Sequence, residues 1–381
     1  MSMNICVPDN KGVCKLLKME TYVDFFNWLD HDTLMRILIC LEDPSDLVRV
    51  SSVSRSWREF VIVNGLCKQL CLRRFPCLHR VDHVIEPNCG MKNPSEDGCS
   101  KSVEWETLER EHRVYAFLAR GCTSFALREC IADAISASST DNYPEESIHN
   151  TLEPRDRVAW GASYWSSKGQ SDSASCEMLT YKLVADICVI NEISIRPFQA
   201  FFQRGSPIYS SKSVRFRMGH TKAPEDEFTG EPSDNCANDN FIWTYTSPEF
   251  AMAQENRLQK FKLPEPVLCI GGILQVELLG RVQKQEMDGL FYLCISHVQV
   301  LGRQLSPPFS VEILEPSGKF VLKAHSYTQP SLPENGSCLI PNAHLEERAG
   351  DLQQFMDLLQ EGLVFEYGWH EDDELDEEMP L

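Results

Sequence analysis

Cysteine and histidine side chains form the first cluster in this sequence that could do chemistry. Cys71, Cys77, His79 and His83 lie in one short stretch, separated by five, one and three residues. Structural zinc sites use closely spaced pairs such as Cys-x-x-Cys, and that pair occurs nowhere in the sequence. We therefore predict no metal site and no cofactor, and interpret these side chains as core thiols and surface imidazoles.

Local catalytic motifs are also absent from the sequence. It contains no Gly-x-Ser-x-Gly, Gly-x-Gly-x-x-Gly, Gly-x-x-x-x-Gly-Lys-Ser/Thr or His-Glu-x-x-His. Catalytic side chains can be assembled from distant positions, so an unrecognised hydrolase stays a third interpretation. Our prediction is that the chain is not an enzyme, and no residue is proposed as catalytic.

Charge and cysteine usage limit the kinds of partner. Lys and Arg number 36 against 56 Asp and Glu, for a formal net charge of −20, and seven of the acids follow His370. Phosphate backbones and anionic lipid repel such a chain, so we predict no nucleic-acid and no membrane partner. The 16 scattered cysteines, without an apolar leader behind basic residues, indicate reduced thiols in the cytoplasm or the nucleus.

Short helices are expected near the amino end. Apolar residues recur at helical spacing over residues 30–41, and Asp-Pro-Ser-Asp at 43–46 supplies a cap, a proline and an acid that restart a helix. A third helix carries Trp57 and is broken by Gly65, and a fourth ends at Pro76. A bundle of about 50 residues buries little surface, so we expect a partner to cover its remaining apolar side chains.

The middle of the chain changes from helical to strand periodicity. Residues 86–100 have loop composition, a helix is expected over Val103–Arg120 with its end at Gly121, and another over Ser124–Ser136. Beyond Arg155 apolar and polar residues alternate, as in 179–183, 214–218 and 274–278, which predicts half-buried strands. About nine strands without intervening helices favour antiparallel sheets in a sandwich or barrel.

These patterns predict an α+β multidomain chain, with a small helical bundle and spacer helices before an antiparallel β-sandwich. A last helix is expected at His344–Gln360, followed by an acidic tail, and His220–Asn240 is expected to be a loop. The predicted limits are a flexible leader at 1–24, the helical module at 25–80, loop and spacer helices at 81–154, the sandwich at 155–315, an extension with a helix at 316–369 and the tail at 370–381.

The stretch Leu29–Phe60, LDHDTLMRILICLEDPSDLVRVSSVSRSWREF, resembles an F-box, the module by which substrate receptors attach to the Skp1 adaptor of cullin-RING ubiquitin ligases. The matching parts are Leu-x-x-Ile-Leu-x-x-Leu at 34–41, Asp-Pro-x-Asp-Leu at 43–47, Val-Ser-Arg-x-Trp at 53–57 and the run 66–75. Many members have Leu-Pro at the entry, whereas Trp28-Leu29 precede Asp30 here. An alternative is a helical subdomain packed only against its own chain.

This resemblance implies roles for individual residues. It implies core positions for Ile37 and Trp57. The residues that it implies as contacts to Skp1 are Trp28, Leu29, Leu34, Leu38, Leu41, Leu47, Val50 and Val53.

The β-rich half is similar to a galactose-binding-like, discoidin-type jelly roll. The similar segments are Tyr-Trp-Ser-Ser at 164–167, the strands 177–183 and 214–217, Tyr-Thr-Ser-Pro at 245–248, Phe-x-Leu-Pro at 261–264 and Val-x-Val-x-Gly at 298–302. In such folds loops at one edge bind the ligand, which makes Trp160, Tyr164 and Trp165 candidate contacts. The alternative is that these aromatic side chains fill the sandwich core.

Together the two resemblances imply a substrate receptor of an SCF-type ubiquitin ligase. The helical module would bind Skp1 and, through it, a cullin-RING complex, and the sandwich would bind the protein to be ubiquitinated. The alternative is a carbohydrate- or small-ligand-binding protein that acts through its sandwich. Any activity would come from positioning a substrate near a partner's enzyme.

Overall fold

The computed structural model of the chain describes residues 3–8, 14–19, 28–86, 100–158, 161–222, 240–314 and 317–325. The helix expected at His344–Gln360, the acidic tail, Trp160 and most of the 220–240 loop lie outside the described residues. In the expected leader, β1 (Met3–Pro8) and β2 (Cys14–Met19) pair antiparallel, which the sequence pattern did not indicate.

The helical module has the four expected helices, α1 (His31–Ile39), α2 (Pro44–Ser51), α3 (Arg55–Val63) and α4 (Leu66–Arg74). Each of the first three begins at a side-chain cap: the oxygens of Asp30, Asp43 and Ser54 accept hydrogen bonds from backbone N–H groups two or three residues later. Gly65 separates α3 from α4 with φ at +56°, a left-handed conformation that glycine adopts without strain.

One long helix, α5 (Ser100–Ser124), follows the 3-10 helix η2 (Pro76–Arg80) and the strand β3 (Val81–Ile85). It continues through Gly121, where the sequence predicted its end. A Cβ atom at Gly121 would lie 3.2 Å from the Leu305 side chain and 3.3 Å from that of Phe125. Glycine is therefore used here for close packing and not as a helix stop.

The helix predicted over Ser124–Ser136 is wrong. These residues form β4 (Arg128–Glu129) and β5 (Ile131–Ala137), and β5 pairs with β9 (Glu177–Leu183). Helix propensity in a short segment is readily overridden by sheet pairing, here by a sheet that has an open edge at β9. The strands of the sandwich therefore begin before Pro154, ahead of the limit that we predicted.

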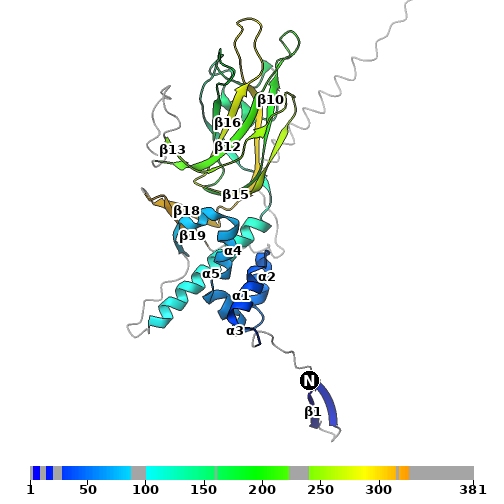
Figure 1. The fold of residues 1–381 in the computed structure, drawn as a ribbon, viewed down its shortest axis with the longest axis vertical. Helices are drawn as coiled ribbons and strands as arrows, with labels where there is room; N and C mark the ends of the chain where they lie inside the picture. Colours follow the sequence, from blue (N-terminus) through cyan, green and yellow to red (C-terminus); the bar gives the residue numbers. More distant parts are fainter. Residues whose placement is uncertain are drawn as a thin grey trace, which may run out of the picture. The chain divides into compact units, whose positions relative to one another are not determined.

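Two antiparallel sheets form the sandwich (Figure 1). The first runs β11-β10-β17-β4, with β15 also paired to β10 and β8 to β17; the second runs β13-β12-β16-β9-β5, with β14 also paired to β12. Their bounds are β8 (Trp165–Ser166), β10 (Ile187–Gln199), β11 (Ile208–Tyr209), β12 (Ser211–Thr221), β13 (Phe241–Thr246), β14 (Phe250–Ala251), β15 (Gln259–Ile270), β16 (Ile273–Arg281) and β17 (Cys294–Gln304).

Smaller elements complete the described fold. They are the pair β6 (Arg157–Val158) and β7 (Gly161–Ala162), the 3-10 helix η3 (Ile148–Leu152), and a third sheet of β18 (Phe309–Leu314), β19 (Lys319–Ala324) and β3. The pair β19–β3 is parallel, and neither strand was predicted from the sequence. β3, which precedes the β-rich half in the sequence, therefore contributes a strand to this sheet.

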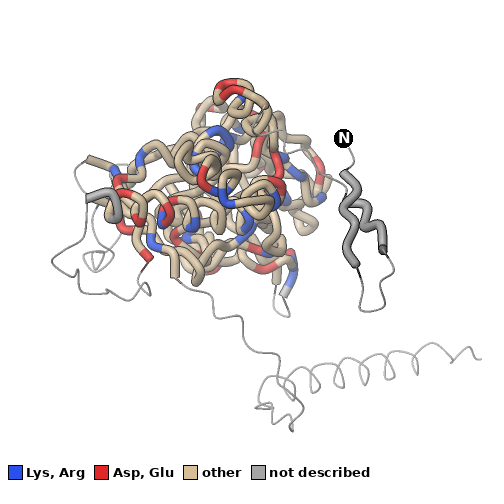
Figure 2. Tube along the Cα trace, turned by 90° about the horizontal axis from the view of Figure 1, so that it is seen from below, with Lys and Arg blue, Asp and Glu red and all other residues tan. Residues whose placement is uncertain are grey.

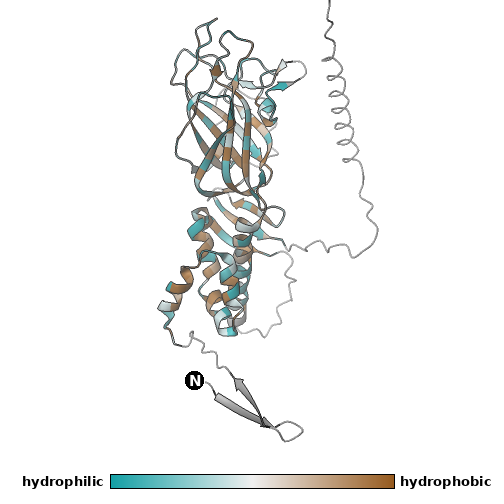
Figure 3. Ribbon diagram, turned by 90° about the vertical axis from the view of Figure 1, so that its right-hand side faces the viewer, coloured by the Kyte–Doolittle hydropathy of each residue, from teal (hydrophilic) through white to brown (hydrophobic). Residues whose placement is uncertain are grey.

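The sandwich core is made by alternate residues of both sheets, such as Ile193 and Ile195 on β10 and Phe216 and Val276 on β12 and β16. Apolar and polar segments accordingly alternate along the strands (Figure 3). A second core contains residues of α4 and α5 together with Ile187 and Leu268 of the sandwich. The helices and the sandwich therefore share one continuous apolar contact.

In the described part of the chain, acidic and basic residues are interspersed (Figure 2).

Candidate functional site

Several of the residues predicted to contact an adaptor are buried within the helical module. Leu34, Leu38 and Leu47 are 3%, 4% and 1% exposed. Leu41 and Val50 are half-buried and pack against the same core. In the free chain these side chains therefore hold the helices together.

Other predicted residues are exposed. Trp28 is 77% exposed, Val53 is 64% exposed, and Leu29 is half-buried. Ile37, which we predicted in the core, is 45% exposed, and this prediction is wrong for the described chain. The apolar stripe of α1 is wider than its contact with the core, so Leu34 and Leu38 are covered and Ile37 is not. Trp57 is 4% exposed and does belong to the core.

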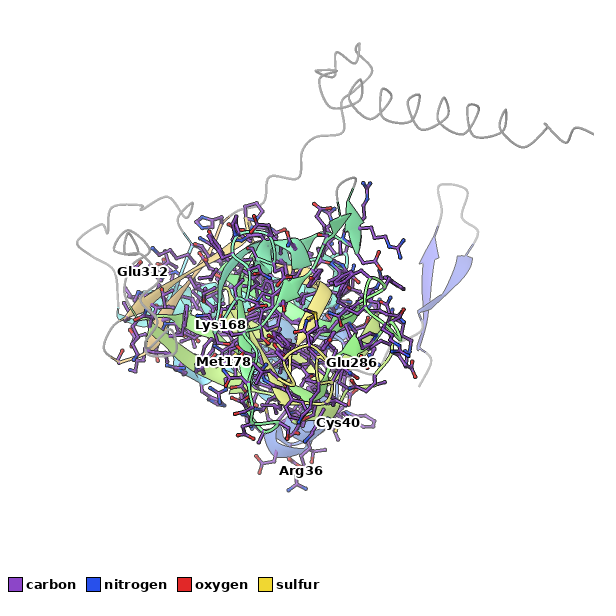
Figure 4. The ribbon with its side chains drawn as sticks, turned by 90° about the horizontal axis from the view of Figure 1, so that it is seen from above. Arg36, Cys40, Lys168, Met178, Glu286 and Glu312 are labelled. Carbon is purple, nitrogen blue, oxygen red and sulfur yellow. The ribbon has the colours of Figure 1, made fainter. Side chains whose placement is uncertain are left out.

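Further apolar side chains on these helices are exposed, and the sequence pattern did not single them out. Their exposure follows from how the helices pack, which the sequence pattern does not show. Together with Trp28, Ile37 and Val53 they form what we call the exposed apolar set: Trp28, Ile37, Ile39, Val48, Val53 and Val63. Polar neighbours Arg36 and Cys40 on and after α1 are exposed as well, and Arg36 points away from the rest of the described chain (Figure 4).

A surface hollow of about 150 Å³ lies between α1, α2 and α4. Leu38, Leu41 and Leu47, three of the predicted adaptor contacts, line it together with Ile39 and Leu70. The Arg73 guanidinium closes one side, because its Nη1 donates to the Ile39 carbonyl at 2.6 Å. The structure thus brings these three leucines together around one hollow.

A second concave site lies at one end of the sandwich, and we call it the aromatic cleft. It measures about 130 Å³. Its walls come from the loop after β5, the segment before β8, the end of β10 and the turn that follows, β11, and the loop before β17. The lining residues are Asp141, Asn142, Glu146, Tyr164, Ser166, Phe198, Ala200, Phe202, Gln203, Tyr209, Gln285, Tyr292 and Cys294.

Aromatic rings form two walls of this cleft. The rings of Tyr164 and Phe198 stack at 3.9 Å between centroids, and Phe202 lies 6.3 Å from Phe198. Tyr209 and Tyr292 meet edge to face at 6.3 Å. Phe202 is 65% exposed, while Phe198 and Tyr209 are buried behind the surface rings. The cleft therefore offers ring faces to a ligand on a base of packed aromatic side chains.

The tyrosine hydroxyls donate to groups of the protein itself. Tyr164 Oη donates to Glu146 Oε1 at 2.6 Å, and Tyr292 Oη donates to Asp288 Oδ2 at 2.7 Å. Burial, and then the Glu146 carboxylate, raise the pKa of Tyr164, so its hydroxyl keeps the proton that it donates. Tyr209 Oη donates to Gln203 Oε1 at 2.6 Å, and burial raises the pKa of Tyr209 to about 12.

Two carboxylates face the cleft. Burial, followed by the charge of Glu146, raises the pKa of Asp141. Glu146 Oε2 is a buried oxygen without a hydrogen-bond partner among the described residues. Among the lining residues of the cleft, all of them described, none is lysine or arginine. The fixed charge of this cleft is therefore negative.

The three predicted ligand contacts have different positions. Tyr164 lines the aromatic cleft, Trp160 lies outside the described residues, and Trp165 is fully buried with its Nε1 donating to the Ser139 carbonyl at 3.0 Å. Trp165 thus fills the sandwich core, as the alternative interpretation stated, whereas Ser166, the next residue of β8, lines the cleft, because successive residues of a strand point to opposite faces. Phe198, Phe202 and Tyr292 were missed, since their proximity arises only from the fold.

Within the described ranges, no group of three or more His, Cys, Asp and Glu side chains could hold a metal ion. In the part of the chain that the structure describes, none of the helices combines the length and the apolar character needed to cross a membrane.

Comparisons with known proteins identify relatives of the chain. A family profile described as F-box-like matches residues 31–73. The F-box protein At4g00755 of Arabidopsis thaliana is 57% identical over 319 residues, which cover 82% of this chain and 85% of that protein. The match therefore extends well beyond the helical module.

Solved structures also match about half of this chain. One is a carbohydrate-binding module, CBM32-3, from a family 31 glycoside hydrolase of Clostridium perfringens, with a TM-score of 0.30, 14% identity, and 45% of this chain and 90% of that chain covered. Another is the fucolectin of striped bass (Morone saxatilis) serum, with a TM-score of 0.29, 14% identity, and 47% and 50% covered.

Proposed function

This chain belongs to the F-box protein family, and we propose that it is the substrate-recognition subunit of an SCF-type ubiquitin ligase that binds a Skp1-like adaptor through α1 to α3. F-box proteins are in general adaptors and not enzymes. The adaptor links this chain to a cullin-RING complex, and the sandwich holds the target protein. The assembly acts inside the cell, in the cytoplasm or the nucleus.

The exposed apolar set carries this proposal. Trp28 and Val53 keep 77% and 64% of their surface in water, whereas the leucines of α1 and α2 are buried. Large apolar side chains left exposed next to a filled core are typical of a surface that a partner covers. Aromatic and aliphatic anchors of this kind supply most of the binding energy at protein interfaces.

The hollow between α1, α2 and α4 supports the same assignment. Leu38, Leu41 and Leu47 form its apolar floor, and the Arg73 guanidinium fixes its rim. An apolar side chain of the adaptor can enter such a hollow and displace water from it. The predicted adaptor residues thus fall into two groups. Some are exposed and can contact the adaptor directly, and others are buried and hold the helices in position.

The burial of these side chains decides which variants test the proposal. Substituting Leu38 or Leu47 by aspartate would place a charge in the core and unfold the module. Loss of adaptor binding would then report unfolding and not the loss of a contact. Ile37→Asp and Val53→Asp change exposed side chains on and beside the helices. Combined in one variant, they are expected to weaken adaptor binding by about 100-fold or more, as loss of two anchors does.

The control is Val103→Asp on α5, outside the matched F-box region. Val103 is 63% exposed and Val53 is 64% exposed, so the two changes are matched in chemistry and exposure. Each full-length variant is co-purified with a co-expressed Skp1-like adaptor, and thermal melting verifies its fold. Retained binding by the Ile37→Asp, Val53→Asp variant, or equal loss by the control, would contradict the proposal.

Target binding is assigned to the sandwich because this half carries the concave aromatic site. The cleft lies on loops at one end of rigid sheets, where binding residues are commonly presented. Holding a target there raises its concentration near the catalytic partner, which is chemistry by positioning.

A further inference from the structure

We propose that the aromatic cleft binds one basic side chain, a lysine or an arginine, of the target protein. This inference rests on the proposed function, because it names the chemistry by which the sandwich recognises its target. The side chain would enter between the exposed rings and place its cationic head against Glu146 and Asp141.

The hydrogen-bonding groups of the cleft favour a ligand that donates hydrogen bonds. The hydroxyls of Tyr164, Tyr209 and Tyr292 already donate to protein oxygens at 2.6 to 2.7 Å. Glu146 Oε2 remains a buried acceptor, and no described residue donates to it. Glu146 lines the cleft, and the negative charge of a carboxylate with an unpaired oxygen attracts a cationic donor that enters it.

The charges in the cleft favour a positively charged ligand. Asp141 and Glu146 bring two carboxylates to a site whose lining contains no lysine or arginine. Part of the rise in the pKa of Asp141 comes from the negative charge of Glu146, because two nearby carboxylates repel each other when both are ionised. A positively charged ligand relieves this repulsion, whereas a neutral ligand leaves it in place.

The rings favour the same ligand. Ammonium and guanidinium groups are attracted to the faces of tyrosine and phenylalanine, and their aliphatic stems pack on apolar surface. Tyr164, Phe202 and Tyr292 are the rings of the cleft with exposed surface. Phe202, 65% exposed at the rim, is placed to cover the stem of an entering side chain.

The size of the cleft limits what enters. Its volume of about 130 Å³ is well below the roughly 300 Å³ at which drug-sized ligand pockets begin. One side chain or one sugar ring fits this space. A sugar hydroxyl could also donate to Glu146, but it would leave the second carboxylate charge uncompensated, and for this reason we favour the basic side chain.

The test uses the full-length chain and simple probes. Nα-acetyl-lysine amide and Nα-acetyl-arginine amide are titrated against the backbone amide NMR signals of residues 141–143, 145–146 and 199–203. Nα-acetyl-norleucine amide, which has the aliphatic stem without the charge, and galactose are the comparison ligands. We expect the basic probes to shift these signals and to bind about tenfold more tightly than the norleucine probe.

Substitution of Glu146 separates charge from shape. Glu146→Gln keeps an oxygen that can accept from the Tyr164 hydroxyl and removes the negative charge, so the basic probes should bind about tenfold more weakly. Glu145→Gln is the matched control: it removes the same charge from an exposed neighbour that does not line the cleft, and it should change nothing. Phe202→Ala, at an exposed position, should weaken the basic probes several-fold without affecting the fold.

The outcomes separate this inference from the proposed function. Equal binding of the norleucine probe, binding of galactose alone, or undiminished lysine binding by Glu146→Gln would each overturn the basic-side-chain assignment. Adaptor binding is measured on the same samples and should be unchanged in Glu146→Gln. Basic-probe binding by a wild-type chain that fails to bind the adaptor would overturn the proposed function and leave the cleft assignment standing.

Discussion

At the scale of single residues, the electrostatics of the cleft depend on Asp141. Partial burial and the neighbouring carboxylates Glu146 and Asp288 raise its pKa, while Lys168 opposes them. A raised pKa means that Asp141 takes up a proton at a higher pH than an ordinary aspartate, whose pKa is about 3.9. The negative charge offered to a cation is therefore complete only above this raised pKa.

The first prediction concerns pH. Binding of Nα-acetyl-lysine amide should be strongest near neutral pH and should weaken as the pH falls through the raised pKa of Asp141. Asp141→Asn should bind more weakly at about pH 7 and show a flatter profile down to about pH 4. NMR titration at several pH values checks this, and a wild-type profile as flat as that of the variant would contradict it.

A second prediction concerns Gly169, beside the wall of the cleft. A Cβ atom there would lie 2.6 Å from Tyr292 Oη and 2.9 Å from Leu290 Cδ1. Gly169→Ala should therefore push the Tyr292 ring from its place and weaken basic-probe binding several-fold. Gly161→Ala, where nothing lies within 4 Å of the new Cβ, should bind like the wild type. The same NMR titration applies, and equal affinities of the two variants would count against the position of Tyr292.

At the scale of elements, one buried ion pair ties strands to loops. Arg281, at the end of β16, is fully buried and pairs with Glu177 at the start of β9. Its Nη1 also donates to Ser167 Oγ at 2.9 Å and to the Phe291 carbonyl at 2.9 Å. These partners belong to the segments next to Ser166 and Tyr292, so the pair holds walls of the cleft on the sheet.

The third prediction follows from this pair. Glu177→Gln leaves the buried Arg281 guanidinium without its counter-charge and should lower the free energy of unfolding by about 3–5 kcal/mol. Glu255→Gln breaks the surface pair Arg257–Glu255, whose side chains are 61% and 56% exposed, and should cost about 0–1 kcal/mol. Chemical denaturation measures both, and similar losses would show that the buried pair is not structural.

Periodicity predicted most elements but not those decided by distant partners. The caps and apolar spacing of α1 to α4 and the alternation in β9, β12 and β16 are local signals, and these elements are present. The segment 124–136 has weak helical spacing, and pairing with β9 makes it a strand. Within the described chain, Gly121 marks a close approach to Leu305 and not a helix end, which spacing cannot reveal.

The candidate sites show the same division. The F-box motif located the helices, yet it did not separate exposed Ile37 from buried Leu38, because both fit one apolar stripe. Tyr164, a predicted ligand contact, lines the cleft, whereas Trp165 next to it fills the core. Glu146 and Phe202 are 56 residues apart in sequence, and only the folded loops bring them to one cleft.

At the scale of the whole molecule, the helices and the sandwich are not independent. One apolar core contains Leu70 of α4, Leu118 of α5, Ile187 of β10, Leu268 of β15 and Phe320 of β19. All five are at least nine-tenths buried. Separating the halves would expose these side chains to water, at about 25 cal/mol for each Å² of apolar surface.

The fourth prediction is that the described region unfolds as one unit. Calorimetry of the full chain should show a single transition for the helices and the sandwich. A fragment of residues 155–315 lacks β4 and β5 and exposes Ile187 and Leu268, so it should be far less stable or aggregate. Two separate transitions, or a fragment as stable as the full chain, would contradict a shared core.

The proposal that matters most is the docking of a Skp1-like adaptor on the exposed apolar set. Isothermal titration calorimetry of the purified full chain with a purified Skp1-like adaptor, at several temperatures, measures this docking directly. Burial of Trp28, Ile37 and Val53 predicts a one-to-one complex with a clearly negative heat-capacity change. The absence of binding at micromolar concentrations, or a heat-capacity change near zero, would contradict the account.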